Sequence, residues 1–377
     1  MSNPRFLQIH TLHSYTAALL NRDDTGQAKR LLYGGTSRTR ISSQCLKRHW
    51  RTSENDPNAL QKIPNFEPAF RSRELVTEKV IEPLREAYDE TIVNAIEPLF
   101  QQFVYGDKAD KGKKSRQTLL LGRPEIDWLA TQAASIAKNA KDVNDAKSAA
   151  TELKKSKNFK AMTEGALLPG GLVGALFGRM VTSDPAANID APVHVAHAFT
   201  VHAAETEGDY FTAVDDLKGD DDESGADTIQ ETELTCGLFY GYVVIDLPGL
   251  IENCGLEKGI ASAAVKSLVH LIAEVSPGAK LGSTAPYGRA DLMLIEAGDR
   301  QPRSLSRAFR SDISNNFPVA RDALSTQLNE FDDTYETGEE RKYLSVEGEL
   351  ESVNAEKTNL AALADWASER VNYAPVD

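Results

Sequence analysis

The stretch NRDDTGQAKRLLYGGTSRTRISSQCLKRHWR, residues 21–51, differs in charge from the rest of the chain. Residues 1–51 contain nine lysines and arginines and two aspartates, which leaves +7. The 377-residue chain carries −14, so its other 326 residues sum to −21. A small basic surface on an acidic protein is typical of a polyanion site, since clustered cations repel unless an anion lies between them. A basic edge packed against an acidic neighbour would give the same pattern.

A tight turn and an extended run are predicted at the centre of this stretch. Gly34 and Gly35 supply the positive-φ freedom that such a turn requires. In the extended run that follows, Arg38 and Arg40 are two residues apart and should project from the same face.

A helix is predicted to begin at Ser42 or Ser43, because a serine is a favoured N-cap. Helical spacing places four polar side chains on one face: Gln44, Lys47, Arg48 and Arg51. Free N–H groups at a helix start, with hydroxyls beside them and a cationic face beyond, suit phosphates. This pattern predicts contact with a phosphate backbone and not with a base sequence.

Two blocks of this stretch carry a family resemblance. LNRDDTGQAKRLLYGG (20–35) and RTRISSQCLKRHWR (38–51) closely resemble the N-terminal signature of the CasC family, the backbone subunit of type I-E Cascade, a CRISPR RNA-guided surveillance complex. Further matches follow in the family's order: GRM (178–180), AHAFTVH (196–202), YFTAVDDL (210–217), GLFYGYVVIDL (237–247) and EVSPGAK (274–280). The resemblance covers most of residues 5–290, and residues 55–165 and those after 300 match only in general character.

The resemblance implies an α+β fold built on a ferredoxin-like or RNA-recognition-like palm. We expect the palm in residues 1–54, 166–202 and 237–300, with a helical insertion, the fingers, at 55–165. Residues 203–236 would form a protruding thumb hairpin, and 301–377 a helical extension packed on the palm. Helical periodicity within 55–165 and strand-like runs at Phe6–Leu12 and Leu238–Leu247 agree with this division. Asp291–Ile295 would be the last strand.

The resemblance also implies a function. The chain would be a structural RNA-binding subunit, not an enzyme, that polymerises head to tail along CRISPR RNA and displays guide bases to target DNA. Expected partners are about six copies of itself and subunits of the CasA, CasB, CasD and CasE types, with no cofactor. The expected RNA-binding residues are Arg22, Lys29, Arg38, Arg40, Ser42, Gln44, Lys47, Arg48, Arg51, Met180 and Lys280.

Three of the expected contacts depend on the resemblance alone. Met180 would wedge against guide bases, although spacing by itself would place it in the core. Phe211 and Val214 of the thumb would contact the guide or a neighbouring subunit. The glycines around Met180, at 170, 171, 174 and 178, indicate close backbone packing, because they form neither a phosphate loop nor a dinucleotide fingerprint.

An RNA-cleaving relative, like the backbone subunits of type III complexes, is the alternative function. Asp23 or Asp24 would then hold a metal ion that activates water or a ribose hydroxyl. The competing interpretation is that these carboxylates pair with Arg22 or Lys29 and shape the loop. The histidines at 194, 197 and 202 do not suggest a metal site, because strand geometry separates them.

Composition limits the setting of the protein. A hydrophobic content of 41% supports a substantial core, and no window approaches eighteen apolar residues. The N-terminus lacks an apolar signal core, and the three cysteines, Cys45, Cys236 and Cys254, share no metal-like spacing. We therefore expect a cytoplasmic protein with reduced thiols, no bound metal and no membrane segment.

Overall fold

The computed structural model describes residues 3–106, 109, 112–155, 168–181, 185–213 and 228–376. The chain forms two compact units. The sheet unit contains Met1–Leu60, His194–Ile245 and Ser262–Pro375, and the helical unit contains Gln61–Val193 and Asp246–Ala261, with the last two residues. These boundaries differ from the expected ones, since contacts group residues 168–193 with the helices and not with the sheet.

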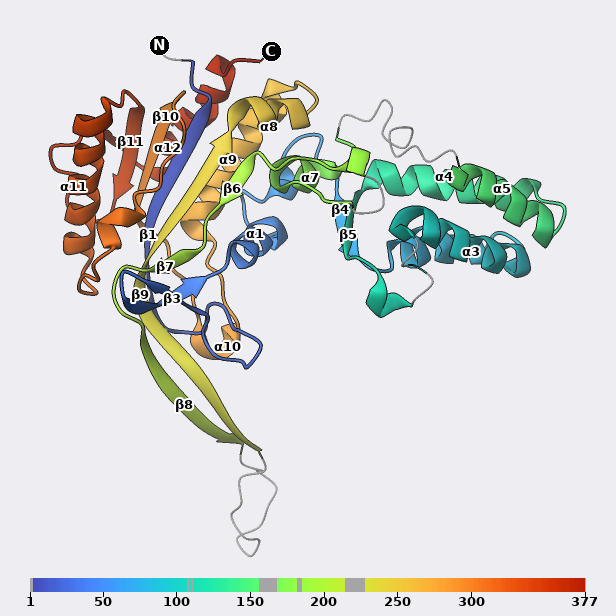
Figure 1. The fold of residues 1–377 in the computed structure, drawn as a ribbon, viewed down its shortest axis with the longest axis horizontal. Helices are drawn as coiled ribbons and strands as arrows, with labels where there is room; N and C mark the ends of the chain where they lie inside the picture. The colour runs from blue at the N-terminus through green and yellow to red at the C-terminus, as the bar shows by residue number, and fades with distance from the viewer. Residues whose placement is uncertain are drawn as a thin grey trace, which may run out of the picture. The chain divides into compact units, whose positions relative to one another are not determined.

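A ten-stranded sheet organises the described part of the sheet unit (Figure 1). Its main path runs β12-β11-β10-β1-β9-β7-β3-β2, and β6 and β8 also pair with β9. The strands are β1 (Phe6–Ala18), β2 (Arg30–Tyr33), β3 (Thr36–Ile41), β6 (Val193–Val195), β7 (Ala198–Thr200), β8 (Glu205–Ala213), β9 (Thr228–Asp246), β10 (Ala290–Gly298), β11 (Glu340–Ser345) and β12 (Glu356–Lys357). The four central strands β10-β1-β9-β7 therefore alternate early and late segments of the chain.

Both faces of the central strands are covered, which explains why residues on both sides of β1 are buried. Leu12 packs with Leu238, Leu292 and Leu294 against η6 (Ser306–Phe309) and α11 (Phe317–Tyr335). On the opposite face, side chains of β1 and β9 line one small cavity with α1 (Ser43–Thr52) and α9 (Lys258–Glu274). Each face of the sheet thus has its own helical layer.

The C-terminal segment completes the sheet and is not purely helical. β11 pairs antiparallel with β10, and β12 pairs parallel with β11. The expectation that Asp291–Ile295 forms the last strand, with a helical tail beyond it, was therefore wrong. Glu340–Ser345 contains mostly polar residues, so the sequence pattern did not indicate that Arg341 and Tyr343 are buried. The last helix, α12 (Leu360–Tyr373), does bury Leu363 and Trp366, as expected.

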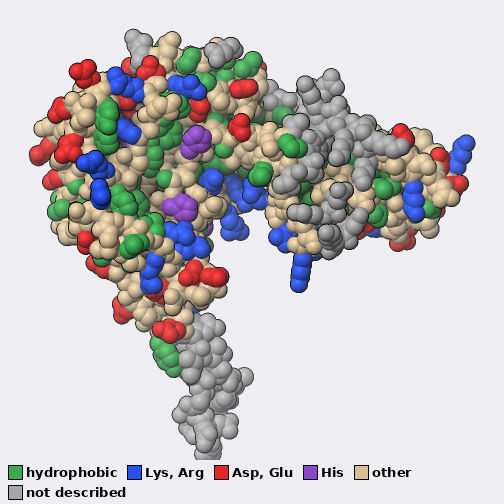
Figure 2. Space-filling model, in the orientation of Figure 1, with side chains coloured by type: hydrophobic (Ala, Val, Ile, Leu, Met, Phe, Trp, Pro, Cys, Tyr) green, Lys and Arg blue, Asp and Glu red, His purple; other side chains and the backbone are tan. Residues whose placement is uncertain are grey.

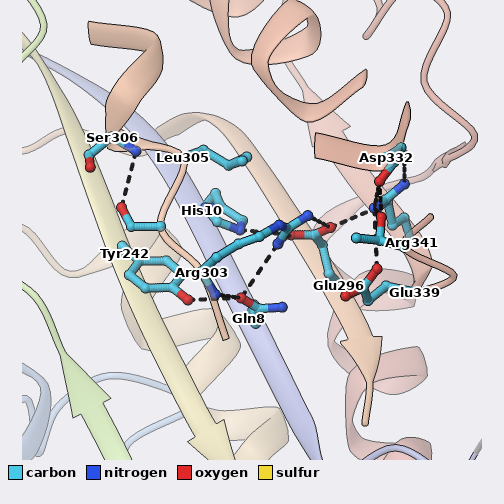
Figure 3. A network of polar contacts seen from close by, with 12 residues as sticks. Gln8, His10, Tyr242, Glu296, Arg303, Leu305, Ser306, Asp332, Glu339 and Arg341 are labelled. Carbon is cyan, nitrogen blue, oxygen red and sulfur yellow. Dashed lines mark hydrogen bonds and ion pairs between the residues drawn. The ribbon is translucent and has the colours of Figure 1, made fainter. Parts of the chain in front are cut away.

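A buried carboxylate joins three parts of this unit (Figure 3). Glu296 of β10 accepts hydrogen bonds from Arg303 (2.6 and 2.8 Å) and from Nε of Arg341 (2.7 Å), and lies 2.9 Å from His10 of β1. Burial would raise the pKa of Glu296, but hydrogen bonds from His10 and Arg303 outweigh it and hold that pKa well below its usual range. Glu296 therefore stays charged inside the fold.

The β8 and β9 strands extend beyond the rest of the sheet as a hairpin (Figure 1). Their register is antiparallel from Glu205 opposite Cys236 to Ala213 opposite Thr228. Residues 214–227 and the side chains of 211–213 and 228–230 lie outside the described part.

The helical unit is not entirely helical, contrary to the expectation for 55–165. The unit also contains a two-stranded sheet of β4 (Ala69–Ser72) and β5 (Leu119–Gly122). The helices between residues 73 and 118 lie between these two strands in the sequence. The helices are η1 (Leu60–Lys62), the π-helix η2 (Val76–Ile81), α2 (Glu82–Arg85), α3 (Glu90–Tyr105), η4 (Lys113–Ser115), α4 (Arg123–Asn139), α5 (Val143–Lys155), α7 (Gly171–Phe177), η5 (Pro185–Ala187) and α8 (Leu247–Asn253). Short apolar strands such as LLLG read equally well as helix, so periodicity missed them.

No helix in the described ranges is long and apolar enough to cross a membrane.

Candidate nucleic-acid interface

The start of α1 is fixed to the loop that precedes it. Ser42 is the N-cap, as predicted, and its Oγ accepts a hydrogen bond from the Cys45 N–H (3.3 Å). The Ser42 N–H in turn donates to Oδ1 of Asn21 (2.8 Å). Ser42 is buried, so its hydroxyl shapes the helix start. The direct contact of Ser42 with RNA stays a prediction.

Asp23 shapes the loop at residues 21–29. Its Oδ1 accepts hydrogen bonds from the Thr25 N–H, the Thr25 hydroxyl and the Gln27 N–H at 2.7–3.0 Å. The hydrogen bond from the Thr25 side chain lowers the pKa of Asp23, helped by the backbone N–H groups. These local partners favour the structural interpretation of Asp23, although they differ from the arginine or lysine partner that we expected.

The cations of the stretch surround α1 and the neighbouring strand. Burial raises the pKa of the Cys45 thiol of α1 to about 11, and the positive charges of Arg48 and Lys29 oppose that rise. Arg40 donates from Nε to the Arg30 carbonyl (3.1 Å), and its Nη1 lies 2.9 Å from Nδ1 of His197. Figure 2 shows lysine and arginine side chains gathered where α1 and β3 lie in Figure 1.

The exposure of the expected residues varies across this surface. Arg22, Gln44 and Arg48 are exposed, whereas Lys29, Arg40, Lys47 and Arg51 are partly buried. We name these seven residues, together with Lys280, the basic surface.

Arg38 does not belong to the basic surface, which corrects our prediction. Its side chain is fully buried, and it donates from Nη1 to the Thr200 carbonyl and from Nη2 to the Phe309 carbonyl, both at 3.1 Å. Strand alternation placed Arg38 and Arg40 on one face, but β7 and η6 supply carbonyl partners that hold Arg38 inside the fold, whereas Arg40 is partly exposed.

Lys280 reaches the same region from a distant part of the sequence. Ala279 forms a bridge with Leu19, and the Gly278 N–H donates to Nε2 of His49 at the end of α1 (3.4 Å). Lys280 has a left-handed backbone (φ +54), and its Nζ donates to the Thr232 hydroxyl. The loop after α9 is therefore joined to Leu19, just before the loop at 21–29, and to α1.

Met180 lies in the helical unit and is 67% exposed. Gly178 precedes it with φ +72, and a Cβ there would lie 2.8 Å from the Ile189 carbonyl oxygen. Arg179 is anchored by a buried ion pair with Glu125, and Gln117 donates to the Met180 carbonyl (3.0 Å). Met180 lines a pocket of about 480 Å³ with polar side chains that include Arg71, Gln117 and Asn188. An exposed thioether on a rigid support can pack against a planar group.

The two expected thumb contacts are Phe211 and Val214. Phe211 lies on β8 opposite Gln230, and nothing is described of its side chain. Val214 lies outside the described residues.

The three histidines have separate surroundings. His197 faces Arg40, His202 accepts a hydrogen bond from the Leu238 N–H (3.2 Å), and His194 is exposed. Among the described residues, no group of three or more histidine, cysteine or carboxylate side chains could hold a metal ion.

Sequence reasoning missed two residues of this region. Asn21 caps the N–H of Ser42, and Arg30 pairs with Glu233 of β9, which also accepts from the Ala28 N–H (2.7 Å). Arg30 thus follows the alternative of a basic edge packed on an acidic neighbour. An asparagine before a loop is only a weak sign of a cap. The partner of Arg30 lies 203 residues away, so no local pattern indicates this pair.

Comparison with solved structures gives the class of fold. The chain is similar to a subunit of a solved "CRISPR RNA-guided surveillance complex, pre-nicking", with TM-score 0.80, 27% identity, and coverage of 97% of this chain and 100% of that one. A chain of another "CRISPR RNA-guided surveillance complex" shares the fold at TM-score 0.60 and 22% identity, over 97% and 98% of the two chains. No curated protein matches the sequence.

Residues 7–369 match the model of the CT1975-like protein family, so the chain belongs to that family. This membership and the structural matches confirm the relationship to CasC-type backbone subunits that the blocks at 20–35 and 38–51 predicted.

Proposed function

We propose that this protein is the RNA-binding backbone subunit of a type I-E Cascade. Copies would assemble head to tail along CRISPR RNA and display its bases to target DNA. The observation that carries the proposal is the structural match over almost the whole of both chains. The strand order β10-β1-β9-β7, with α1 and α9 on one face, supports the interpretation of this core as a ferredoxin-like palm.

The basic surface would hold phosphates and sugars of the guide. Its cations come from the loop at 21–29, from β3, from α1 and from the loop after α9, which hydrogen bonds join into one region. A subunit that serves every guide sequence must grip the backbone, because only the backbone is common to all guides. Pairing between guide and target then reads the sequence.

Two further regions would shape the guide. Met180, exposed on its anchored loop, would wedge against bases, and the hairpin of β8 and β9 would act as the thumb that reaches a neighbouring subunit. Phe211 and Val214 remain our candidates for the contact at the thumb. The helical unit would correspond to the fingers. CasA, CasB, CasD and CasE type subunits would complete the assembly in the cytoplasm.

Co-expression with a CRISPR RNA and the partner subunits tests this proposal. The wild-type chain should elute as a large assembly that contains RNA of defined length. The amount of RNA recovered with Lys47→Ala/Arg51→Ala should be at least tenfold lower than with the wild type, because two contacts to the RNA phosphate backbone are removed. Arg307→Ala/Lys357→Ala removes the same charge from exposed positions outside the basic surface and should retain the RNA.

Recovery of the wild type only as an RNA-free monomer would contradict the proposal. Equal RNA loss in both double variants would show that net charge, and not the basic surface, governs binding. Thermal unfolding of each variant separates loss of binding from loss of folding.

A further inference from the structure

Arg40 has two hydrogen-bond partners in the structure, and neither is an anion. Its Nε donates to the Arg30 carbonyl (3.1 Å), and its Nη1 lies 2.9 Å from Nδ1 of His197. In the part of the chain that the structure describes, no carboxylate forms an ion pair with Arg40, whereas Arg30 pairs with Glu233. A guanidinium is always charged. The partly exposed Arg40 therefore carries a positive charge that no described ion pair balances.

The pairing of two strands brings His197 to Arg40. β3 and β7 run antiparallel with Arg40 opposite Phe199, and His197 immediately precedes β7. His197 is therefore two residues from the position opposite Arg40, the diagonal spacing at which long side chains on paired strands can touch. The two residues are 157 positions apart in the chain, so the contact depends on the folded sheet.

The contact also fixes the protonation of the His197 ring. An arginine side chain only donates hydrogen bonds, so Nδ1 of His197 must be the acceptor and carry no proton. Desolvation and, after it, the positive charge of Arg40 lower the pKa of His197, which keeps the ring neutral near pH 7. A neutral His197 is thus an acceptor for Arg40 and does not repel it.

The two acceptors together orient the guanidinium. Rotation of the Arg40 side chain would break the bonds to the Arg30 carbonyl and to His197, so less side-chain freedom remains to be lost when a ligand binds. Nη2 takes part in neither bond and is left for a ligand. The planar fork of an arginine matches the oxygens of a phosphate. An oriented arginine without an ion pair therefore suits a phosphate.

We propose that His197 is a positioning residue, which holds Arg40 toward a phosphate of the guide RNA. The inference rests on the proposed function, because it assigns the missing anion to the RNA that the basic surface would bind. His197 is exposed, and Figure 2 shows a histidine side chain at the surface beside lysine and arginine side chains. His197 adds no charge of its own, so its effect on RNA binding is exerted through Arg40.

The RNA affinity of the full-length chain tests this inference, measured by fluorescence anisotropy with a labelled CRISPR RNA. Arg40→Gln should weaken binding at least fivefold and reduce the slope of log K against log salt by about 0.7, because one phosphate contact is removed. His197→Ala should weaken binding at least threefold. His197→Asn should stay within twofold of the wild type, because the asparagine oxygen can replace Nδ1 as the acceptor. The matched control is His194→Ala, at an exposed histidine three residues away, which should leave binding unchanged.

A double-variant cycle isolates the positioning role. In the Arg40→Gln background, His197→Ala should cause less than a twofold further loss of affinity, because no guanidinium is left to position. A threefold loss in both backgrounds would overturn the inference. Equal losses in His197→Asn and His197→Ala, or in His194→Ala and His197→Ala, would overturn it as well. The thermal unfolding midpoint of each histidine variant should match that of the wild type, so that lost affinity reports a lost contact.

Failure of this inference and failure of the proposed function give different results. If Lys47→Ala/Arg51→Ala loses RNA while Arg40→Gln and His197→Ala bind it as the wild type does, the proposed function stands and the role of His197 is wrong. A wild-type chain that binds no RNA contradicts both.

Discussion

Arg179 and Glu125 form an ion pair closed off from solvent. Nη1 of Arg179 lies 2.6 Å from both carboxylate oxygens, and the two side chains are 3% and 0% exposed. The remaining donors of Arg179, Nε and Nη2, go to the Ala187 carbonyl (3.1 and 2.8 Å). The exposed Met180 is therefore attached to one of the most fully bonded side chains of the helical unit.

Removal of the carboxylate should destabilise this unit strongly. Glu125→Ala leaves a buried guanidinium without its anion, and we expect a loss of about 3–5 kcal/mol in the free energy of unfolding. Urea denaturation followed by circular dichroism measures it. Asp127→Ala is the control, because Asp127 pairs with Arg123 at an exposed position and should cost about 0–1 kcal/mol. Similar losses of unfolding free energy in the two variants would show that the buried ion pair contributes no more to stability than the exposed one.

Gly34 and Gly35 offer a comparison within a single turn. Both have positive φ (+62° and +88°), but a Cβ at Gly34 would lie 1.5 Å from the Arg310 carbonyl oxygen, whereas a Cβ at Gly35 meets nothing within 4 Å. Gly35→Ala should therefore cost about 1–2 kcal/mol from backbone strain. Gly34→Ala should cost more than about 3 kcal/mol, because β2 and β3 must also move. A larger loss of stability in Gly35→Ala would contradict this account.

His13 should make the stability depend on pH. Burial lowers the pKa of His13 from 6.5 to about 4, so between these values the unfolded chain binds a proton that the folded chain does not. The free energy of unfolding should therefore fall as the pH drops from 6.5 to 4, by up to about 1.4 kcal/mol per pH unit for this group. His13→Gln should reduce the dependence, measured as the urea midpoint against pH. The exposed His194, changed to Gln, should leave it as in the wild type.

The salt dependence of RNA binding counts the phosphate contacts of the basic surface. Arg48 is exposed on α1, and we expect Arg48→Gln to reduce the slope of log K against log salt by about 0.7, the value for one contact to a single strand. Fluorescence anisotropy with a labelled CRISPR RNA at four salt concentrations measures the slope. Lys357→Gln removes an exposed charge elsewhere and should leave it unchanged. An unchanged slope for Arg48→Gln would remove this residue from the interface.

Local signals predicted the start of the candidate site well. The serine N-cap, the glycine pair and the cationic face of α1 depend on neighbours within a few residues, and the structure has Ser42, Gly34 and Gly35 in those roles. Arg38 shows the limit of such signals. Its burial depends on Thr200 and Phe309, which lie 162 and 271 residues further along the chain.

The extent of the sheet was also beyond local reasoning. β11 contains Arg341, a charged residue that alternation assigns to the surface, yet its partners Glu296 and Asp332 allow it to be buried. The same holds for Met180, which apolar character assigns to the core and which the structure exposes. The burial of Arg341 depends on partners in other elements, which local patterns do not reveal. The exposure of Met180 was expected only from the family resemblance.

The contact between His10 and Glu296 has a consequence for synthesis on the ribosome. The two residues are 286 positions apart, and β1 pairs with β10 along most of its length. At about 5–20 residues per second, β1 would leave the ribosome on the order of tens of seconds before its partner strand. A nascent chain must therefore keep one edge of β1 unpaired for that time, even after β9 has been made on its other side, and an open strand edge of this kind is what chaperones would need to shield.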